Sequence, residues 1–182
     1  TSPVSFQTRV DSPLDKRVST VGTVHPHVEV KIIDADSGRI CSVQEMGELC
    51  TRGYSVMLGY WQNPEATASV IDDQGWMHTG DIAVMDSEGY VNIVGRIKDM
   101  IVRGGENVYP REIEEFLMTH TAVEAVQVTG VPDPKYGEEI IAWISVKPGA
   151  ELSEEAVKEF CRGQIAHFKV PRYIRFGEAF PM

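Results

Sequence analysis

Hydrophobic and polar residues alternate with a period of two in several short segments of the first half of the chain. In residues 27–34, Val28, Val30 and Ile32 stand between polar neighbours, which is the pattern of a half-buried β-strand. Further short strands are predicted over residues 47–52, 82–85 and 90–94. The Asp-Ser-Glu-Gly segment between the last two predicts a hairpin turn. The first half should therefore be rich in antiparallel β-structure.

Helical periodicity becomes prominent only in the second half. Pro110 opens a predicted helix over residues 110–120, and Ser153 should cap another that continues to about residue 166. The residues expected to face inward from these helices are Ile113, Phe116, Leu117, Ala156, Val157, Phe160 and Ile165. Strands are predicted over residues 122–128, 139–146 and 173–176. This pattern is typical of a small α+β module.

The change in character near residues 96–98 predicts two domains. Residues 1–96 form the strand-rich domain, which contains one short helix over residues 64–71, with Asn63 as its cap. Residues 97–182 form the α+β domain. A chain of 182 residues has room for two small domains. The expected fold class is therefore mixed, with an antiparallel β part followed by a small α+β domain.

The composition argues against several kinds of partner. Acidic residues number 27 against 17 basic ones, the formal charge is −10, and no basic stripe is present, so nucleic acid and anionic lipid are poor candidates. No apolar run approaches the roughly 20 residues of a membrane-spanning helix. The three cysteines lack a CxxC pairing and are expected to be free thiols. Free thiols favour a reducing compartment, hence a cytoplasmic location, with an organelle still open.

The segment WMHTGDI, at residues 76–82, contains the first candidate binding residue. Thr-Gly-Asp by itself is a common structural turn. A carboxylate at such a turn, however, offers two oxygens that can accept hydrogen bonds from two adjacent ribose hydroxyls. Asp81 is therefore a candidate for holding a nucleotide, whereas His78 is expected only to neighbour it in the turn.

A second candidate segment, GRIKDMIVRGGENVYPREIE, covers residues 95–114. Arg96 follows a hydrophobic strand, which places a guanidinium at a strand end where it can meet phosphate or ribose oxygens. The alternative is that Arg96, Lys98 and their charged neighbours simply face water. In that case Gly104 and Gly105 would form a flexible loop before the helix.

Both segments, together with GELCTRGYSVMLGY at residues 47–60, resemble motifs of the adenylate-forming (AMP-binding) superfamily. The GEL string is largely structural there, so it receives no catalytic residue. The strings RGGENVYP and HFKVP are similar to those of fatty-acyl-CoA ligases more than to those of carrier-protein-loading domains. The resemblance implies a reaction in which a carboxylate attacks Mg-ATP to give an acyl-adenylate, and coenzyme A then takes the acyl group.

The resemblance also implies roles for individual residues. Asp81 would bind the ribose of ATP, and Arg96 would contact the ribose and phosphate region. Lys98 would be the hinge about which the second domain swings between two catalytic poses. Gly104, Gly105 and, more loosely, Asn107 would line the tunnel for the pantetheine arm of coenzyme A, where bare backbone allows close passage.

The resemblance covers essentially the whole chain but only the carboxyl third of a full synthetase. Residues 1–96 would then belong to a distorted antiparallel β-barrel part of the large domain, and residues 97–182 to a mobile domain that is incomplete at its end. The phosphate loop, the magnesium ligand and the lysine of the last family motif are expected outside this sequence. No catalytic residue or metal ligand is therefore assigned, and the segment alone is expected to be inactive.

Two other functions stay open at this point. One is a peptide-synthetase-type adenylation fragment, whose partner would be a carrier protein instead of free coenzyme A. The other is an isolated, non-catalytic nucleotide-binding module, because much of the expected active site is not in the sequence.

Overall fold

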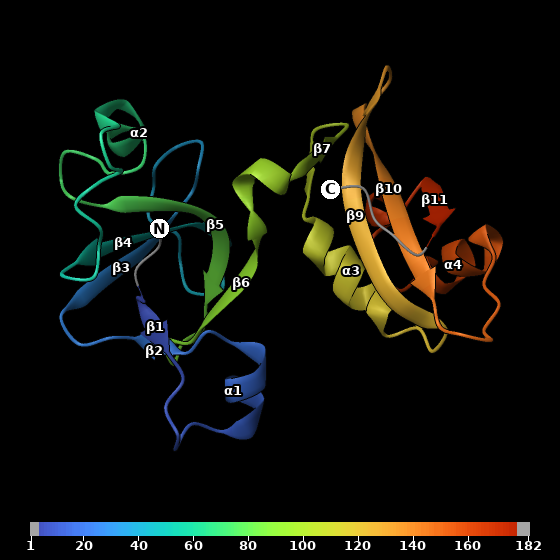
Figure 1. Cartoon of the computed structure of the whole chain (residues 1–182), viewed down its shortest axis with the longest axis horizontal. Helices are drawn as coiled ribbons and strands as arrows, with labels where there is room; N and C mark the ends of the chain where they lie inside the picture. The colour runs from blue at the N-terminus through green and yellow to red at the C-terminus, as the bar shows by residue number, and fades with distance from the viewer. Residues whose placement is uncertain (1–3, 178–182) are drawn as a thin grey trace. The chain divides into compact units, whose positions relative to one another are not determined.

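The computed structural model describes residues 4–177 and divides the chain into two compact units, Thr1–Ile97 and Lys98–Met182. The outermost residues of the two predicted domains, 1–3 and 178–182, lie outside the described part. Each unit has its own main sheet, whose strands are labelled in Figure 1. Each unit also has its own hydrophobic core.

The first unit is built on a four-stranded antiparallel sheet. Its strands, in spatial order, are β3 (Val28–Ile33), β4 (Gly47–Gly53), β5 (Met77–Met85) and β6 (Val91–Arg96). One face buries a cluster made of Ile32, Leu49, Ala83 and Val91. These strands confirm the alternating pattern, although β5 begins five residues earlier than predicted. Within residues 4–177 this sheet ends at β3 and β6, so a barrel is not confirmed.

Short elements complete this unit: strands β1 (Phe6–Gln7) and β2 (Thr23–Val24), and helices α1 (Leu14–Ser19) and α2 (Pro64–Ala68). The Asn63 side chain caps α2 by accepting a hydrogen bond from the Ala66 N–H, as predicted. The helix ends at Ala68 and not at residue 71, because Ile71 forms a β-bridge with Met77. Helix α1 was not predicted, since it is six residues long and buries none of them.

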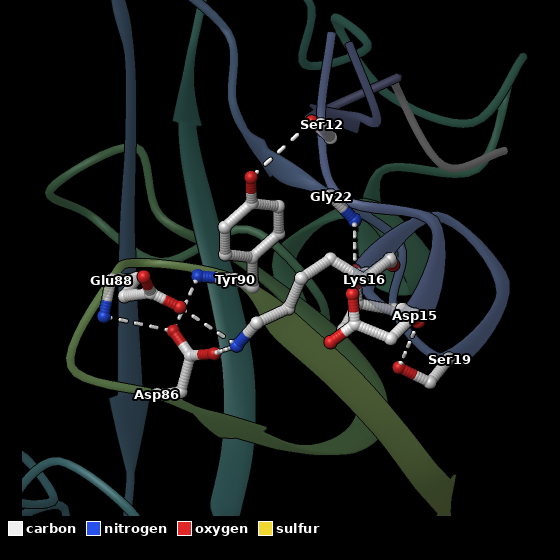
Figure 2. A network of polar contacts seen from close by, with 9 residues as sticks. Ser12, Asp15, Lys16, Ser19, Gly22, Asp86, Glu88 and Tyr90 are labelled. Atoms are coloured by element: carbon white, nitrogen blue, oxygen red, sulfur yellow. Dashed lines mark hydrogen bonds and ion pairs between the residues drawn. The ribbon is translucent and has the colours of Figure 1, made fainter. Parts of the chain in front are cut away.

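Polar contacts attach α1 to the turn between β5 and β6 (Figure 2). The Lys16 ammonium contacts both Asp86 and Glu88, and it lies 5.0 Å from the centre of the Tyr90 ring. The Asp86 carboxylate also accepts the Tyr90 N–H at 2.9 Å. A helix without a buried face is thus held by charge and hydrogen bonds instead of by packing.

The second unit contains a five-stranded sheet. The 3-10 turn η1 (Ile97–Asp99) begins on the last residue of the first unit. It is followed by β7 (Ile101–Arg103), β8 (Glu106–Val108), α3 (Pro110–Met118), β9 (Val123–Asp133), β10 (Gly137–Val146), α4 (Glu154–Cys161), the 3-10 turn η2 (His167–Lys169) and β11 (Tyr173–Phe176). Strand β10 pairs antiparallel with β9 over its length, and with β11 (parallel) and β7 over different parts.

Both helices of this unit cover one face of its sheet. Ile113 and Leu117 of α3 and Val157 of α4 are buried in one cluster with the alternate residues Ile140, Ala142 and Ile144 of β10. The rings of Phe116 and Phe160 stack with their centres 4.9 Å apart, which joins the two helices directly. No helix within residues 4–177 is long and apolar enough to cross a membrane.

Two details of the predicted α4 are wrong. The helix is capped by Ser153 as expected, with the Ala156 N–H donating to its hydroxyl, but it ends at Cys161. Gly163 then adopts a φ of 71°, a left-handed conformation that breaks the helical path before residue 166. Ala156 is exposed, whereas Val157 carries the inward contact.

A buried ion pair joins β7 to β10 in the second unit. The fully buried Glu139 carboxylate accepts hydrogen bonds from Arg103 at 2.7 and 2.8 Å, and Arg172 lies 3.3 Å away. Arg103 also donates to the Phe168 carbonyl at 3.2 Å. The Arg103 guanidinium holds the pKa of Glu139 below its usual range, so this carboxylate is charged when folded at neutral pH.

Replacing Arg103 with methionine should lower the free energy of unfolding by about 2 kcal/mol at neutral pH. Loss of one partner of a buried ion pair generally lowers the free energy of unfolding by more than this value. The loss should be smaller here because Arg172 still faces Glu139. Because the folded pKa of Glu139 is depressed, the stabilising contribution is present above the unfolded pKa and is lost as pH falls. Hydrogen exchange of the β10 amides at neutral and acid pH measures both effects.

Arg111→Met is the matched control, because Arg111 pairs with Glu115 on the exposed surface of α3. It should change the exchange rates little. Equal effects of the two substitutions at neutral pH would contradict a stabilising role for the buried pair.

Candidate functional site

The Thr-Gly-Asp segment forms a bulge in strand β5. In the ladder between β4 and β5, Glu48 pairs with Ile82 and Cys50 pairs with His78. The three residues 79–81 therefore stand opposite Leu49 alone. Such a bulge bends the strand and redirects a side chain, and bulges are common beside functional sites. The sequence predicts a turn at this point, and the structure shows an irregular strand instead.

Gly80 allows the bulge because it adopts a φ of 71°, a backbone conformation that residues other than glycine rarely adopt. The bulge is tied to its neighbours by hydrogen bonds: the Thr79 hydroxyl donates to the Leu49 carbonyl at 2.8 Å, and the Asp81 N–H donates to the same hydroxyl at 3.1 Å. Thr79 thus connects the backbone of Asp81 to strand β4.

Glu48 makes a second connection between β4 and the bulge. Its side chain accepts the Gly80 N–H through Oε1 at 3.2 Å and contacts His78 Nδ1 through Oε2 at 2.9 Å. Only 8% of Glu48 is exposed. His78 lies beside the bulge, as expected, and its Nε2 is 3.8 Å from Asp72.

The two residues predicted to bind nucleotide face each other across the ladder of β5 and β6. Asp81 pairs in register with Arg96, and the Arg96 Nε lies 3.3 Å from the Asp81 Oδ1. Both side chains reach solvent, with 58% of the Arg96 side chain and 29% of the Asp81 side chain exposed. A carboxylate that can accept hydrogen bonds from two hydroxyls therefore lies beside a guanidinium that can donate hydrogen bonds to phosphate oxygens.

One cluster of metal-type ligands occurs in the described part of the chain: Glu48, Cys50 and His78, whose ligand atoms lie within 4.8 Å of one another. A thiol and an imidazole do not suit Mg²⁺, which prefers oxygen ligands. Burial raises the pKa of Cys50 to about 12, so this thiol keeps its proton at neutral pH. The three groups thus form a hydrogen-bonded cluster beside the bulge.

The remaining predicted site residues belong to the second unit. Lys98 lies in η1, at the first position after the division between the units, and its exposed ammonium makes no ion pair within residues 4–177. Asn107 is exposed on β8, where it pairs in register with Val102.

Gly104 and Gly105 form the two-residue turn of the hairpin between β7 and β8. Their φ angles are 62° and 90°, and a turn with positive φ at both central residues matches the twist of a hairpin. The Gly104 N–H donates to the Tyr136 carbonyl at 2.8 Å. The two glycines thus form a tight turn that is hydrogen-bonded to the backbone of Tyr136.

The sequence interpretation missed Glu48. Its place in the GEL string favours a structural role, and its contacts with Gly80 and His78 depend on a strand register that no local pattern reveals. A signal was nevertheless present, because a glutamate within a strand of mostly buried residues must find a partner.

Both ends of the chain match models of known protein families. Residues 1–61 match the family model of the AMP-binding enzymes, and residues 112–182 match that of the AMP-binding enzyme C-terminal domain. The predicted site residues lie between these two matches.

Curated relatives align with the whole chain. YngI of Bacillus subtilis, named as an acyl-CoA synthetase, is 52% identical over 181 residues, which are 100% of this chain and 33% of that protein. The mitochondrial medium-chain acyl-CoA ligase ACSF2 of Bos taurus is 48% identical, over 100% of this chain and 29% of the relative. The chain thus spans about a third of the length of the curated relatives it matches.

Solved structures share the fold. The crystal structure of ATP-bound MatB from Rhodopseudomonas palustris has a TM-score of 0.91 and 35% identity, over 97% of this chain and 35% of MatB. The o-succinylbenzoate-CoA synthetase MenE of Bacillus subtilis, in complex with its acyl-adenylate intermediate, has a TM-score of 0.82 and 30% identity, over 91% of this chain and 33% of MenE.

Proposed function

This chain belongs to the family of AMP-binding enzymes, and we propose from this that it is the carboxyl-side part of an ATP-dependent, AMP-forming acyl-CoA synthetase. The observation that carries the proposal for this chain is the pair of Asp81 and Arg96, which face each other beside the bulge. One residue suits a ribose diol and the other suits phosphate.

In the proposed reaction, an oxygen of the substrate carboxylate bonds to the α-phosphorus of ATP, and pyrophosphate leaves. The sulfur of the coenzyme A thiolate then bonds to the acyl carbon, and AMP leaves with the electron pair of the broken C–O bond. Asp81 would orient the ribose and Arg96 the neighbouring phosphate in the first step. Such positioning lowers the barrier without covalent participation by either residue.

The two units would be parts of different domains of the enzyme. We assign the first to the β-barrel part of the large domain and the second to the mobile C-terminal domain. Lys98 is the first residue of the second unit, which suits a hinge. Gly104, Gly105 and Asn107 belong to a narrow hairpin that could approach the pantetheine arm closely.

A fatty acid is the substrate class we favour, since ACSF2 is named as a medium-chain acyl-CoA ligase. A cytoplasmic location stays part of the proposal, and the mitochondrial location in that relative's name makes an organelle the alternative. Mg²⁺ would be held by residues other than the Glu48 cluster, whose ligand types do not suit it.

The proposal is tested with the protein encoded by the full open reading frame around this sequence. Incubation with ATP, Mg²⁺, coenzyme A and fatty acids of graded length should give AMP and acyl-CoA in equal amounts. AMP formation that requires a carrier protein instead of coenzyme A would favour a peptide-synthetase-type enzyme. Nucleotide binding without product would indicate a non-catalytic module.

The 182-residue chain alone should not catalyse ATP–pyrophosphate exchange with any carboxylic acid. The metal-type ligands among its described residues do not suit Mg²⁺, and the phosphate loop expected from the family is not in the sequence. Radiolabelled pyrophosphate incorporation into ATP measures this reaction, with the full-length protein as the positive control. Exchange by the purified segment would show that the chemistry resides within these residues.

A further inference from the structure

We propose that Glu48 is a positioning residue for nucleotide recognition, which holds the bulge at residues 79–81 in the shape that directs the Asp81 carboxylate to the ribose. This inference rests on the proposed function, because it assumes that Asp81 binds ATP. Glu48 belongs to the GEL string, which was interpreted from the sequence as structural. The proposal gives this residue an indirect role in nucleotide binding.

The first reason is that both oxygens of Glu48 are directed at the bulge or its flank. Oε1 accepts the Gly80 N–H at 3.2 Å, and Oε2 lies 2.9 Å from His78 Nδ1. A nearly buried carboxylate is costly unless it is hydrogen-bonded, so its contacts fix its orientation. Glu48 is therefore placed to restrain the residue directly before Asp81.

The second reason is that Gly80 has no side-chain packing to hold its conformation in the bulge. A Cβ built on Gly80 would meet no atom within 4 Å, so the space beside this residue is open. Its φ of 71° belongs to a residue type with the widest conformational freedom. Hydrogen bonds must then define the shape of the segment, and Glu48 accepts the one from Gly80 itself.

The third reason is that the bulge interrupts the ladder between β4 and β5. Residues 79–81 have only Leu49 opposite them, so side chains replace the missing backbone partners. Glu48 accepts the N–H of Gly80, and the Thr79 hydroxyl accepts the N–H of Asp81 while donating to the Leu49 carbonyl. The side chains of Glu48 and Thr79 thus fix the two peptide groups that flank the Cα of Gly80.

A merely structural role for Glu48 would predict lower stability alone. A positioning role predicts in addition that the enzyme loses its ability to distinguish ATP from 2′-deoxy-ATP. If Asp81 accepts both ribose hydroxyls, the wild-type protein should use ATP about tenfold better than 2′-deoxy-ATP, as judged by kcat/KM, because one charged hydrogen bond is missing with the analogue.

The test measures this ratio in the full-length protein carrying Glu48→Leu, which keeps the side-chain size and removes both acceptors. The ratio should fall to about two, and KM for ATP should rise about tenfold, as expected when the half-buried Gly80 N–H loses its charged partner. Glu48→Gln, which retains one acceptor oxygen, should restore most of the ratio. Thr79→Val removes the adjacent hydrogen bonds and should lower the ratio as well, which provides a second test if Glu48→Leu does not fold.

Thr51→Val is the matched control on the same strand. Thr51 is fully buried, and its hydroxyl lies 2.9 Å from that of Ser5, away from the bulge. Its loss should reduce stability while leaving the nucleotide ratio unchanged.

The outcomes separate this inference from the proposed function. If Asp81→Asn abolishes the preference for ATP while Glu48→Leu and Thr79→Val keep it, Asp81 binds ribose and the positioning role of Glu48 is wrong. If the wild type shows no preference and Asp81→Asn changes nothing, the proposed ribose contact itself fails. If Thr51→Val lowers the ratio as much as Glu48→Leu does, the effect is general destabilisation of β4, and the inference is overturned.

Discussion

Replacing Asp81 with alanine in the full-length enzyme should raise the KM for ATP roughly tenfold to a hundredfold. The carboxylate stands on the bulge of β5 with 29% of its side chain exposed, so a ribose could reach it. Loss of a hydrogen bond to a charged group costs about 1.5–3 kcal/mol, which corresponds to this range. The measurement is the rate of pyrophosphate release over a range of ATP concentrations at saturating acid.

A neighbouring acidic residue provides the control for this substitution. Asp73 is exposed in the same unit, and Asp73→Ala removes the same charge without touching the bulge. This variant should have the KM of the wild type. Unchanged ATP kinetics in a folded Asp81→Ala protein would exclude Asp81 from the nucleotide site, and equal changes in both variants would point to the overall charge of the unit.

Much of the fold could be predicted from local patterns. The alternation of Val28, Val30 and Ile32 indicated β3, and the turn at residues 86–89 indicated the hairpin of β5 and β6. Asn63 and Ser153 both act as helix caps. These features depend on residues close in sequence, which is why a single sequence reveals them.

Features that depend on distant residues were missed. Helix α1 has no buried face, and contacts with Asp86 and Glu88, far along the chain, hold it in place. The hairpin of β7 and β8 has strands of three residues, too short for a clear alternation. Its Gly-Gly pair was interpreted as a loop, and only the pairing of Arg103 with Glu106 shows that it is a hairpin turn.

In the candidate site, too, local features were predicted and features that depend on distant residues were missed. Asp81 and Arg96 were predicted separately from their motifs, but the register that places them 3.3 Å apart was not. That register depends on an irregularity in the β5–β6 ladder, where β6 carries an extra residue between Ile93 and Gly95. Irregular pairing leaves little trace in the pattern of polar and apolar residues, because it is set by hydrogen bonds between strands.

Substitutions at Lys98 and Gly105 should separate the two half-reactions of the full-length enzyme. Lys98 lies in a 3-10 turn, a conformation whose φ is typically close to the −65° that proline imposes. Lys98→Pro should therefore hinder any pose that needs a different φ at this residue. A hinge that cannot rotate would keep the enzyme in one catalytic pose. Acyl-adenylate should then form at a nearly normal rate. The rate of thioester formation should fall about a hundredfold, which is the loss expected when reacting groups are no longer held in the correct geometry.

Gly105→Trp tests the tunnel without disturbing the contact between the hairpin and Tyr136. A Cβ at Gly104 would lie 3.1 Å from the Tyr136 ring, whereas a Cβ at Gly105 would meet nothing within 4 Å. The indole would therefore project into space that the pantetheine arm is proposed to use. Gly149→Trp is the control, because Gly149 has a similar φ of 78° and equally open surroundings in the same unit.

Separate measurement of pyrophosphate release and acyl-CoA formation decides between a domain swing and a passive surface hairpin. A swing with a tunnel predicts that Lys98→Pro and Gly105→Trp impair only the second step, and that Gly149→Trp impairs neither. A passive hairpin predicts that Gly105→Trp behaves like Gly149→Trp, because both substitutions impose the same backbone strain at a positive φ. Equal loss of both steps in Lys98→Pro would indicate damage to the fold and would count against a hinge at this residue.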